Sequence, residues 1–214
     1  KIIYDKMIKA IIFDLDGTLV GVEKEFRRNL IRNVLDEFNK KVPDHELDEL
    51  WFMHSRSEMV KKWGIDVDVF WDAFKKNDSV KTRIKHTYVY DDIDYLNSLK
   101  EKGIKLALLT GARHEIAHAE VDLLNRSVFE FVLIADPNGD VPSKPHPLGV
   151  EKCLEKLGID KKNAIYVGNS DEDLLTAKNA GMFLVLIDRN EHKHDLLPDM
   201  KITTLNELDK IIKK

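Results

Sequence analysis

Cysteine is nearly absent from this sequence, whose 214 residues include only Cys153. One cysteine cannot form an internal disulfide, so a disulfide-stapled extracellular domain is excluded, and a lone thiol is typical of a reducing compartment. We therefore expect a cytoplasmic protein. Cys153 lies in GVEKCLEKLG, on the apolar side of a predicted helix. There we expect a small buried hydrophobic residue rather than a reactive thiol.

Long apolar segments and an excess of positive charge are missing as well. No apolar run approaches the roughly 20 residues that span a bilayer, so we expect no membrane partner. The first residues, KIIYDKMIKAIIF, are interrupted by charged side chains and continue into a predicted strand, which is not the pattern of a signal peptide. The formal net charge is -4. Nucleic-acid binding usually requires a basic face, so we expect no nucleic-acid partner.

One pattern occurs three times: a charged amphipathic helix, a glycine and an apolar strand. It is found in YLNSLKEKGIKLALL, VEKCLEKLGIDKKNAIYVG and LLTAKNAGMFLVLI. Gly103, Gly158 and Gly181 stand where a helix C-cap is expected. The strands are continuous apolar runs, which is typical of a parallel sheet covered on both faces. The sequence therefore predicts an α/β fold, a doubly wound and mostly parallel Rossmann-like sheet with helices on both faces.

Residues 21–85 lack this strand pattern. Helical stripes of apolar residues run through EFRRNLIRNVLDEF, through the segment around Trp51 and through VDVFWDAF. We predict a small all-helical domain at 21–85, inserted after the first strand of an α/β domain formed by residues 1–20 and 86–214. Its three tryptophans are expected to form its own core, with the alternative that one or two of them face a substrate.

Polar residues follow the predicted strands. KAIIFDLDGTLV places two carboxylates, Asp14 and Asp16, directly after an apolar run. Burying an unpaired charge costs several kcal/mol, so two acids at a strand end need a partner or a task. In open α/β sheets, ligands bind at the carboxyl ends of the strands. Other predicted strands are followed at the same edge by Thr110 and Gly111, by Lys144 in PSKPHP, and by Asn169 and Ser170.

Together these residue types suit phosphoryl transfer. A carboxylate such as Asp14 can act as a nucleophile. A second one two residues on, Asp16, can protonate the leaving oxygen and later deprotonate water. Lys144 and Thr110 can hold phosphoryl oxygens. Mg²⁺ binds through few protein oxygens and keeps several waters, so Asp14, a backbone carbonyl and a later acid or amide suit it.

The chain resembles the haloacid dehalogenase-like hydrolases, and among them the phosphatases similar to phosphoglycolate phosphatase. FDLDGTL, LLTG, KPHP and VGNSDEDLLTAKNAGM match four motifs of that family in order and spacing, over about residues 8–187. The resemblance implies that the helical insert is a C1-type cap. It also implies that a small phosphorylated metabolite is hydrolysed through an aspartyl-phosphate intermediate on Asp14. Asp16 would then move the proton, Thr110, Gly111 and Lys144 would bind the phosphate, and Mg²⁺ would be the cofactor.

One position departs from the family pattern. The fourth motif usually reads Gly-Asp-Ser-x-x-Asp, and residues 168–173 read GNSDED. Asn169 replaces the usual metal-ligating acid and Asp173 matches the second one, so the implied metal ligands are Asp14, Asp16, Asn169 and Asp173. An amide oxygen can still ligate Mg²⁺ but adds no negative charge, which predicts a lower metal affinity.

Three alternatives on the same fold remain. A phosphomutase similar to beta-phosphoglucomutase would keep the phosphate on Asp14 until a second sugar binds. A haloacid dehalogenase would share an asparagine near position 169 and use no metal, but it would lack the second aspartate that stands here as Asp16. A non-catalytic binding protein is favoured only by Asn169.

Two histidine pairs invite a metal hypothesis. HEIAH, at residues 114–118, matches the H-E-x-x-H pattern of zinc proteases, and His192 and His194 form a second pair. A motif as short as HEIAH should occur by chance in roughly a few chains per hundred, and no clear third ligand follows it at a typical distance. We interpret the first pair as a partly solvated helix face and the second as part of a solvated charged loop.

Overall fold

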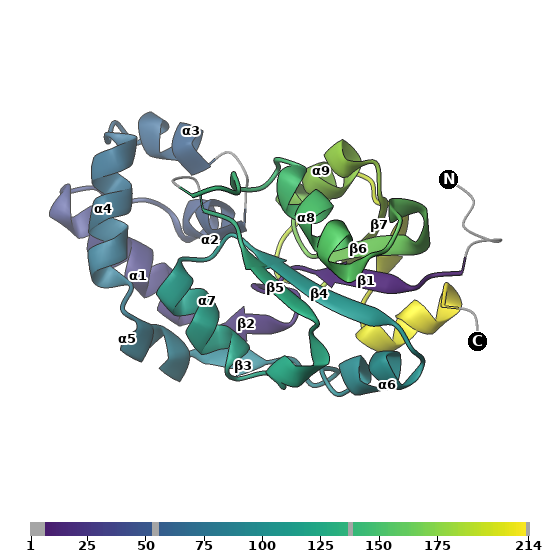
Figure 1. The fold of residues 1–214 in the computed structure, drawn as a ribbon. Helices are drawn as coiled ribbons and strands as arrows, with labels where there is room; N and C mark the ends of the chain where they lie inside the picture. Colours follow the sequence, from purple (N-terminus) through teal and green to yellow (C-terminus); the bar gives the residue numbers. More distant parts are fainter. Residues whose placement is uncertain (1–6, 53–55, 137–138, 213–214) are drawn as a thin grey trace. The chain divides into compact units, whose positions relative to one another are not determined.

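A computed structural model describes residues 7–52, 56–136 and 139–212 of the chain. The described residues form two compact units (Figure 1). One, here called the α/β unit, contains the residues up to Gly21 and from Val89 onward, and the other, the helical unit, is Val22–Tyr88. Among the described residues, no helix combines the length and the hydropathy needed to cross a membrane.

A six-stranded sheet in the order β5-β4-β1-β6-β7-β8 forms the centre of the α/β unit. Its strands are β1 (Ala10–Phe13), β4 (Lys105–Thr110), β5 (Phe131–Ile134), β6 (Ala164–Gly168), β7 (Phe183–Ile187) and β8 (Met200–Ile202). All neighbouring strands are parallel. β1 lies between β4 and β6, where Phe13 pairs with Leu108 and with Val167. The predicted parallel sheet is confirmed, and the residues that follow these three strands share one edge.

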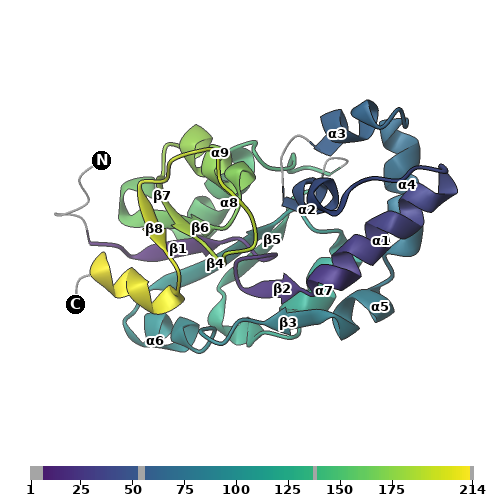
Figure 2. The same cartoon turned by 180° about the vertical axis from the view of Figure 1, so that it is seen from behind.

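Helices cover both faces of the sheet (Figures 1 and 2). α8 (Leu148–Leu157) and α9 (Asp171–Ala180) lie on one face, and α6 (Tyr95–Glu101) and the 3-10 helix η3 (Leu205–Lys210) lie on the other. α7 (His114–Val121) follows β4, with the short 3-10 helices η1 (Arg126–Val128) before β5 and η2 (Lys161–Asn163) before β6. The doubly wound arrangement is therefore confirmed.

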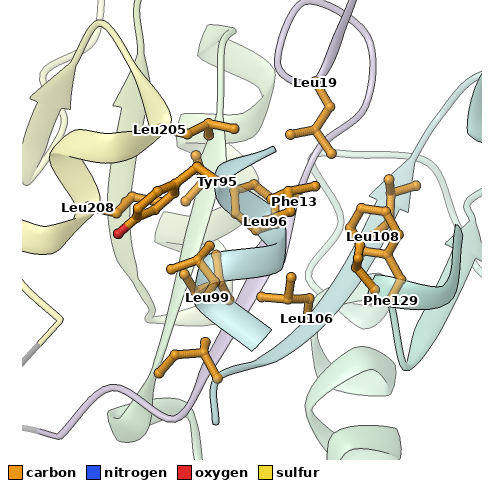
Figure 3. Packing of buried hydrophobic residues seen from close by; sticks show 14 of the residues in the cluster. Phe13, Leu19, Tyr95, Leu96, Leu99, Leu106, Leu108, Phe129, Leu205 and Leu208 are labelled. Atoms are coloured by element: carbon orange, nitrogen blue, oxygen red, sulfur yellow. The ribbon is translucent and has the colours of Figure 1, made fainter. Parts of the chain in front are cut away.

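Both faces of β1 are apolar, because successive residues of a strand point to opposite sides. Ile11 and Phe13 belong to the core under α6 and η3, and Ala10 and Ile12 belong to the core under α8 and α9. Figure 3 shows the first of these cores, in which Phe13, Leu106 and Leu108 lie close to residues of α6 and η3. All four β1 residues are completely buried. A carboxylate placed directly after such a strand is therefore removed from water.

The expected helix ends are present. Gly158 and Gly181 end α8 and α9 in the left-handed conformation, and Gly103 follows α6 with a positive φ of 78°. Cys153 of α8 is completely buried, and burial raises the pKa of its thiol to about 12. This agrees with the prediction of a buried, unreactive side chain.

Five helices make up the described part of the helical unit: α1 (Lys24–Glu37), α2 (Asp44–Phe52), α3 (Arg56–Lys62), α4 (Val67–Asn77) and α5 (Val80–Lys85). Its core is formed by apolar residues of α1, α2, α3 and α4, with Phe70 completely buried. Trp51, Trp63 and Trp71 are partly buried and pack against this core, as expected. Trp63 also donates a hydrogen bond from its indole nitrogen to Glu46 Oε2 at 2.7 Å. That this unit acts as a cap stays a prediction.

Two short strands, β2 (Val20–Val22) and β3 (Thr87–Val89), pair where the chain passes between the units. The sequence pattern indicated neither strand, because three residues are too few to show a periodicity. The units therefore divide after Gly21 and after Tyr88, whereas the predicted boundaries lie after residues 20 and 85. Residues 1–6, which begin the predicted α/β domain, lie outside the described residues.

Candidate active site

Four segments bring polar residues to the carboxyl edge of the sheet. Asp14 follows β1, Thr110 ends β4, Asn169 follows β6, and Lys144 lies in the loop between β5 and α8. All four side chains are buried. Since β4, β1 and β6 are adjacent and parallel, the residues at their carboxyl ends come together although they are far apart in the chain. The predicted cluster of polar strand ends is present.

Lys144 joins two carboxylates. Its Nζ lies 2.7 Å from Asp14 Oδ1 and 2.7 Å from Asp173 Oδ1. The side chains of all three residues are at most 6 % exposed, so these are buried ion pairs. Two carboxylates around one ammonium group leave one negative charge uncompensated within the triad. The site is therefore suited to bind a further cation.

Asp173 has protein donors at both carboxylate oxygens. Oδ1 accepts from Lys144 Nζ at 2.7 Å and from the Tyr166 hydroxyl at 3.0 Å. Oδ2 accepts from the backbone N–H groups of Asn169 and Ser170, each at 3.1 Å, and from the Ser170 hydroxyl at 2.7 Å. Burial alone would raise the pKa of Asp173, but Lys144 and the Ser170 donors outweigh it and hold the pKa below its usual value. Asp173 is thus a fixed anion that orients Lys144.

At Asp14, unlike at Asp173, the effects that raise the pKa outweigh those that lower it. Burial raises its pKa to about 7, and the charges of Asp173 and Asp16 contribute to the rise, while Lys144 opposes it. An added positive charge at this carboxylate would favour its ionised form, which is the form that can act as a nucleophile. The structure therefore gives a reason for a cation next to Asp14.

A tight turn after β1 connects Asp14 to Asn169. The Thr18 hydroxyl lies 3.1 Å from Asp14 Oδ2 and 3.4 Å from Asn169 Oδ1. Gly17, in the left-handed conformation with φ 78°, brings the backbone against Asn169: a Cβ atom at Gly17 would lie 2.1 Å from Asn169 Nδ2. Only glycine fits this approach, which keeps Asn169 beside the turn.

Three of the predicted site residues lie at the same edge of the sheet: Thr110, Gly111 and Asp16. The Thr110 hydroxyl accepts a hydrogen bond from the backbone N–H of Ala112 at 3.0 Å, which orients the loop after β4. A Cβ atom at Gly111 would lie 3.9 Å from Lys144 Cε, so this loop passes close to the lysine. Asp16 is half-buried, and a parallel bridge joins it to Val20.

The residues fit Mg²⁺ as a cofactor, although no group of three or more His, Cys, Asp or Glu side chains in the described ranges is arranged to hold a metal ion. Mg²⁺ needs few protein oxygens because it keeps several waters. Asp14 carries an undercompensated charge, and the amide oxygen of Asn169 shares the Thr18 hydroxyl with it. Asp173 differs, because a metal ion would have to displace its donors. The expectation that Asp173 ligates the metal directly therefore has no support in this arrangement.

Three further residues matter here, of which only Ser170 was noted from the sequence, as a polar residue at the end of a strand. Thr18 contacts Asp14, Tyr166 donates to Asp173, and Ser170 caps α9 through a capping box with Asp173. The pattern S-D-E-D is a capping signal that predicts the role of Ser170. The motif FDLDGTL contains Thr18 and could have drawn attention to it. Tyr166, however, is one apolar-run residue among several, and nothing local distinguishes it.

Neither histidine pair forms a metal cluster within the described part of the chain. His114 Nε2 lies 3.4 Å from Asp136 Oδ2, and the ring centroids of His114 and His118 are 6.5 Å apart. The rings of His192 and His194 meet edge to face, with centroids 4.4 Å apart. His114 and His118 are exposed on α7, which agrees with the interpretation of a partly solvated helix face. The expectation of a solvated loop is wrong for the second pair, because His192 and His194 are partly buried.

Comparisons with known proteins show the family and the fold to which the chain is similar. The family model described as haloacid dehalogenase-like hydrolase matches residues 11–187. The phosphoglycolate phosphatase of Aquifex aeolicus is 29% identical, over 96% of this chain and 97% of that protein. The pyrophosphatase PpaX of Halalkalibacterium halodurans is 29% identical, over 82% of this chain and 81% of that protein. The crystal structure of CbbY from Rhodobacter sphaeroides in complex with phosphate has a TM-score of 0.71 at 21% identity, covering 95% of this chain and 97% of that one.

Proposed function

The chain belongs to the haloacid dehalogenase-like hydrolases and is a phosphatase of that family, and on this premise we propose that it hydrolyses a phosphomonoester of a small metabolite with Asp14 as the nucleophile. One observation carries the proposal: a buried aspartate directly after the central strand is paired, at 2.7 Å, with a buried lysine. A carboxylate and an ammonium group held together in this way suit attack on a phosphoryl group, because the lysine can offset the charge of the phosphoryl oxygens.

The first half-reaction transfers the phosphoryl group to the protein. A carboxylate oxygen of Asp14 bonds to phosphorus, and the bond from phosphorus to the ester oxygen breaks. Asp16 gives a proton to that oxygen, which leaves as an alcohol. The Lys144 ammonium group and the Thr110 hydroxyl, with the loop at Gly111, hold the other phosphoryl oxygens.

The second half-reaction restores the enzyme. Asp16, now a carboxylate, takes a proton from water, and the water oxygen attacks the phosphorus of the aspartyl-phosphate. The bond from phosphorus to the Asp14 oxygen breaks, and inorganic phosphate leaves. Asp173 remains ionised throughout, because its donors favour that form, and it keeps Lys144 directed at Asp14.

Mg²⁺ is the proposed cofactor, and when bound it adds positive charge to the transferring phosphoryl group. Asp14, the backbone carbonyl of Asp16 and the side-chain amide of Asn169 would hold it. Asp173 would support these residues without contacting the metal. The helical unit is proposed to act as the cap that selects the substrate.

Phosphate release tests the proposal. Purified protein is assayed with p-nitrophenyl phosphate, phosphoglycolate, pyrophosphate and other phosphorylated metabolites, with Mg²⁺ and with EDTA. We expect metal-dependent release from at least one ester. Asp14→Asn keeps the shape of the side chain and removes the nucleophile, so it should abolish turnover and the acid-stable labelling of the protein by radioactive substrate.

Asp209→Asn is the matched control. Asp209 pairs with Lys102 away from the sheet edge, so this variant should retain full activity. Full activity in Asp14→Asn would contradict the assignment of the nucleophile. Interconversion of sugar phosphates without phosphate release would instead establish the phosphomutase alternative, and release of chloride would establish the dehalogenase.

A further inference from the structure

We propose that Arg189 is a positioning residue of this active site: it holds the turn at Leu15–Val20, here called the catalytic turn, through the backbone carbonyl of Thr18. This inference rests on the proposed function, because the turn contributes to the site only if Asp14 reacts. Arg189 stands two residues after β7, in a part of the sequence that reads as an ordinary charged loop.

The guanidinium group of Arg189 makes a fork around Thr18 and Asp92. Nη2 and Nε donate to the Thr18 carbonyl oxygen at 2.7 and 3.3 Å. Nη1 donates to Asp92 Oδ2 at 2.8 Å, and Nη2 donates to Asp92 Oδ1 at 3.0 Å. The Arg189 side chain is 7 % exposed. A planar guanidinium can satisfy both partners at once, which an ammonium group cannot do with the same geometry.

The carboxylate and the ring around Arg189 are themselves fixed. Asp92 Oδ2 also accepts the backbone N–H of Leu205 at 2.8 Å. The Tyr90 ring lies under the guanidinium, with its centroid 4.0 Å from Arg189 Cζ, and its hydroxyl donates to Glu191 at 3.1 Å. Arg189 is therefore a rigid attachment point between segments that follow β3, β7 and β8.

The backbone hydrogen bonds within the catalytic turn use few acceptors, one of which is the Val20 carbonyl oxygen that accepts from Gly17 N–H at 2.6 Å. The backbone N–H groups of Thr18, Leu19 and Val20 all point to one acceptor, the carbonyl oxygen of Leu15. A carbonyl oxygen offers two lone pairs, so three donors cannot all form strong hydrogen bonds with it. Gly17 has a positive φ, but glycine can adopt many other backbone conformations, so this residue does not by itself fix the shape of the turn. The contact with Arg189 adds to these bonds a fixed donor for the Thr18 carbonyl oxygen.

The position of this turn matters to Asp14. The same Thr18 whose carbonyl is held by Arg189 places its hydroxyl 3.1 Å from Asp14 Oδ2 and 3.4 Å from Asn169 Oδ1. A displacement of about 1 Å in such a support can lower the rate about 100-fold. Loss of Arg189 should therefore affect the chemical step more than substrate binding.

The test compares Arg189→Ala with Arg189→Lys. We expect Arg189→Ala to lower kcat about 10- to 100-fold with KM changed less than about twofold. Added ethylguanidinium should restore part of the lost kcat by occupying the space of the missing side chain. Arg189→Lys keeps the charge beside Asp92 but loses the fork, so it should also lower kcat. It answers the same question if Arg189→Ala does not fold.

Hydrogen exchange gives a readout that does not depend on activity. Backbone amides of residues 15–20 should exchange faster in both Arg189 variants than in the wild type. Lys102→Ala is the control, because it also removes a contact with an aspartate of the α/β unit, but far along the chain from the catalytic turn. Its exchange at residues 15–20 and its kcat should match the wild type.

The outcomes separate the two proposals. If the wild type hydrolyses no phosphate ester, the proposed function fails, and the exchange rates still decide whether Arg189 holds the turn. If the wild type is active, unchanged exchange at residues 15–20 or an unchanged kcat in the Arg189 variants overturns the positioning role. The positioning role is also overturned if ethylguanidinium does not restore the kcat of Arg189→Ala and Lys102→Ala loses as much kcat as Arg189→Ala.

Discussion

At the scale of single residues, the site is defined by a charge imbalance around Lys144. This one ammonium group lies 2.7 Å from a carboxylate oxygen of each of two buried aspartates. The hydrogen-bond donors around Asp173 hold the pKa of this carboxylate below its usual value, whereas the pKa of Asp14 rises to about 7. A second anionic group next to Asp14 would deepen this imbalance, and an amide would not. The neutral side chain of Asn169 therefore adds no negative charge for a bound cation to offset.

Asn169→Asp tests this interpretation. The added carboxylate supplies the hard, charged oxygen that Mg²⁺ prefers, so the Mg²⁺ concentration for half-maximal activity should fall about tenfold. Without metal, the new charge beside Asp14 lacks a partner, and the melting temperature should fall, to recover when Mg²⁺ is added. Activity and thermal melts across a Mg²⁺ titration measure both effects.

Asn97→Asp makes the same chemical change on the exposed surface of α6. It should leave the Mg²⁺ dependence and the melting temperature nearly unchanged, because an exposed charge stays solvated. An Asn169→Asp variant with the wild-type Mg²⁺ requirement would mean that position 169 does not contact the metal.

At the scale of elements, the packing of α8 on β4 places the loop that follows β4. Gly149 in the first turn of α8 lies against Leu109, the residue before Thr110. A Cβ atom at Gly149 would lie 2.8 Å from Leu109 Cδ1 and 3.1 Å from Cδ2. Leu109 is completely buried and cannot move into solvent. The absence of a side chain at position 149 therefore allows the helix to approach the strand closely.

Gly149→Ala sets two effects against each other. Alanine favours a helix over glycine by about 1 kcal/mol, whereas overpacking a core costs about 1–3 kcal/mol. The close contact involves two methyl groups of a completely buried residue, so we expect the steric cost to win and the free energy of unfolding to fall by about 1 kcal/mol. Urea denaturation measures this change.

A double-mutant cycle identifies the cause. Leu109→Val removes volume at the point of contact, so Gly149→Ala should cost less in its presence than in the wild type. If Gly149→Ala stabilises the protein by itself, helix propensity decides and the close approach of α8 to β4 is not limiting.

At the scale of the whole molecule, the pH dependence of stability should reflect two partly buried histidines in the loop after β7. Burial lowers the pKa of His192 to about 4, with a further contribution from His194, although Glu191, Asp171 and Asp188 oppose the shift. Burial also lowers the pKa of His194. Asp171 ties this loop to α9, because its carboxylate accepts the backbone N–H of Asp195 at 3.0 Å.

The sign of the effect follows from proton binding. Below about pH 6.5 the unfolded chain protonates at position 192, whereas the folded protein resists protonation until about pH 4. The unfolded state then binds more protons, so the free energy of unfolding should fall as the pH falls from about 6.5 to 4. His192→Gln should reduce this loss, as measured by urea denaturation at several pH values.

Asp14 and the other groups that titrate in both the wild type and His192→Gln contribute equally to the two pH profiles. Their contributions therefore cancel when the two profiles are compared. His45→Gln, which changes an exposed histidine on α2, is the control and should keep the wild-type pH dependence. Equal slopes for His192→Gln and the wild type would show that burial of this ring does not contribute to acid sensitivity.

Most of the α/β architecture could be predicted from the sequence, because it depends on local patterns. Continuous apolar runs indicate strands buried on both faces, and Gly158 and Gly181 mark helix ends through a conformation that only glycine adopts easily. The rule that ligands bind at the carboxyl ends of strands then locates Asp14, Thr110 and Asn169 at one edge. The short strands β2 and β3 were not predictable, since they exist through their pairing with each other.

What each charged group contacts was decided only by the tertiary structure. Lys144 and Asp14 are 130 residues apart in the chain, and Arg189 and Thr18 are 171 apart. The sequence by itself determined that carboxylates, a lysine and an amide would meet. The folded chain decided that Asp173 would hold Lys144 and that Arg189 would hold the turn at Thr18. The physical reason is that buried charges take whichever partners the packing of distant segments brings within hydrogen-bond distance, and no local pattern records that choice.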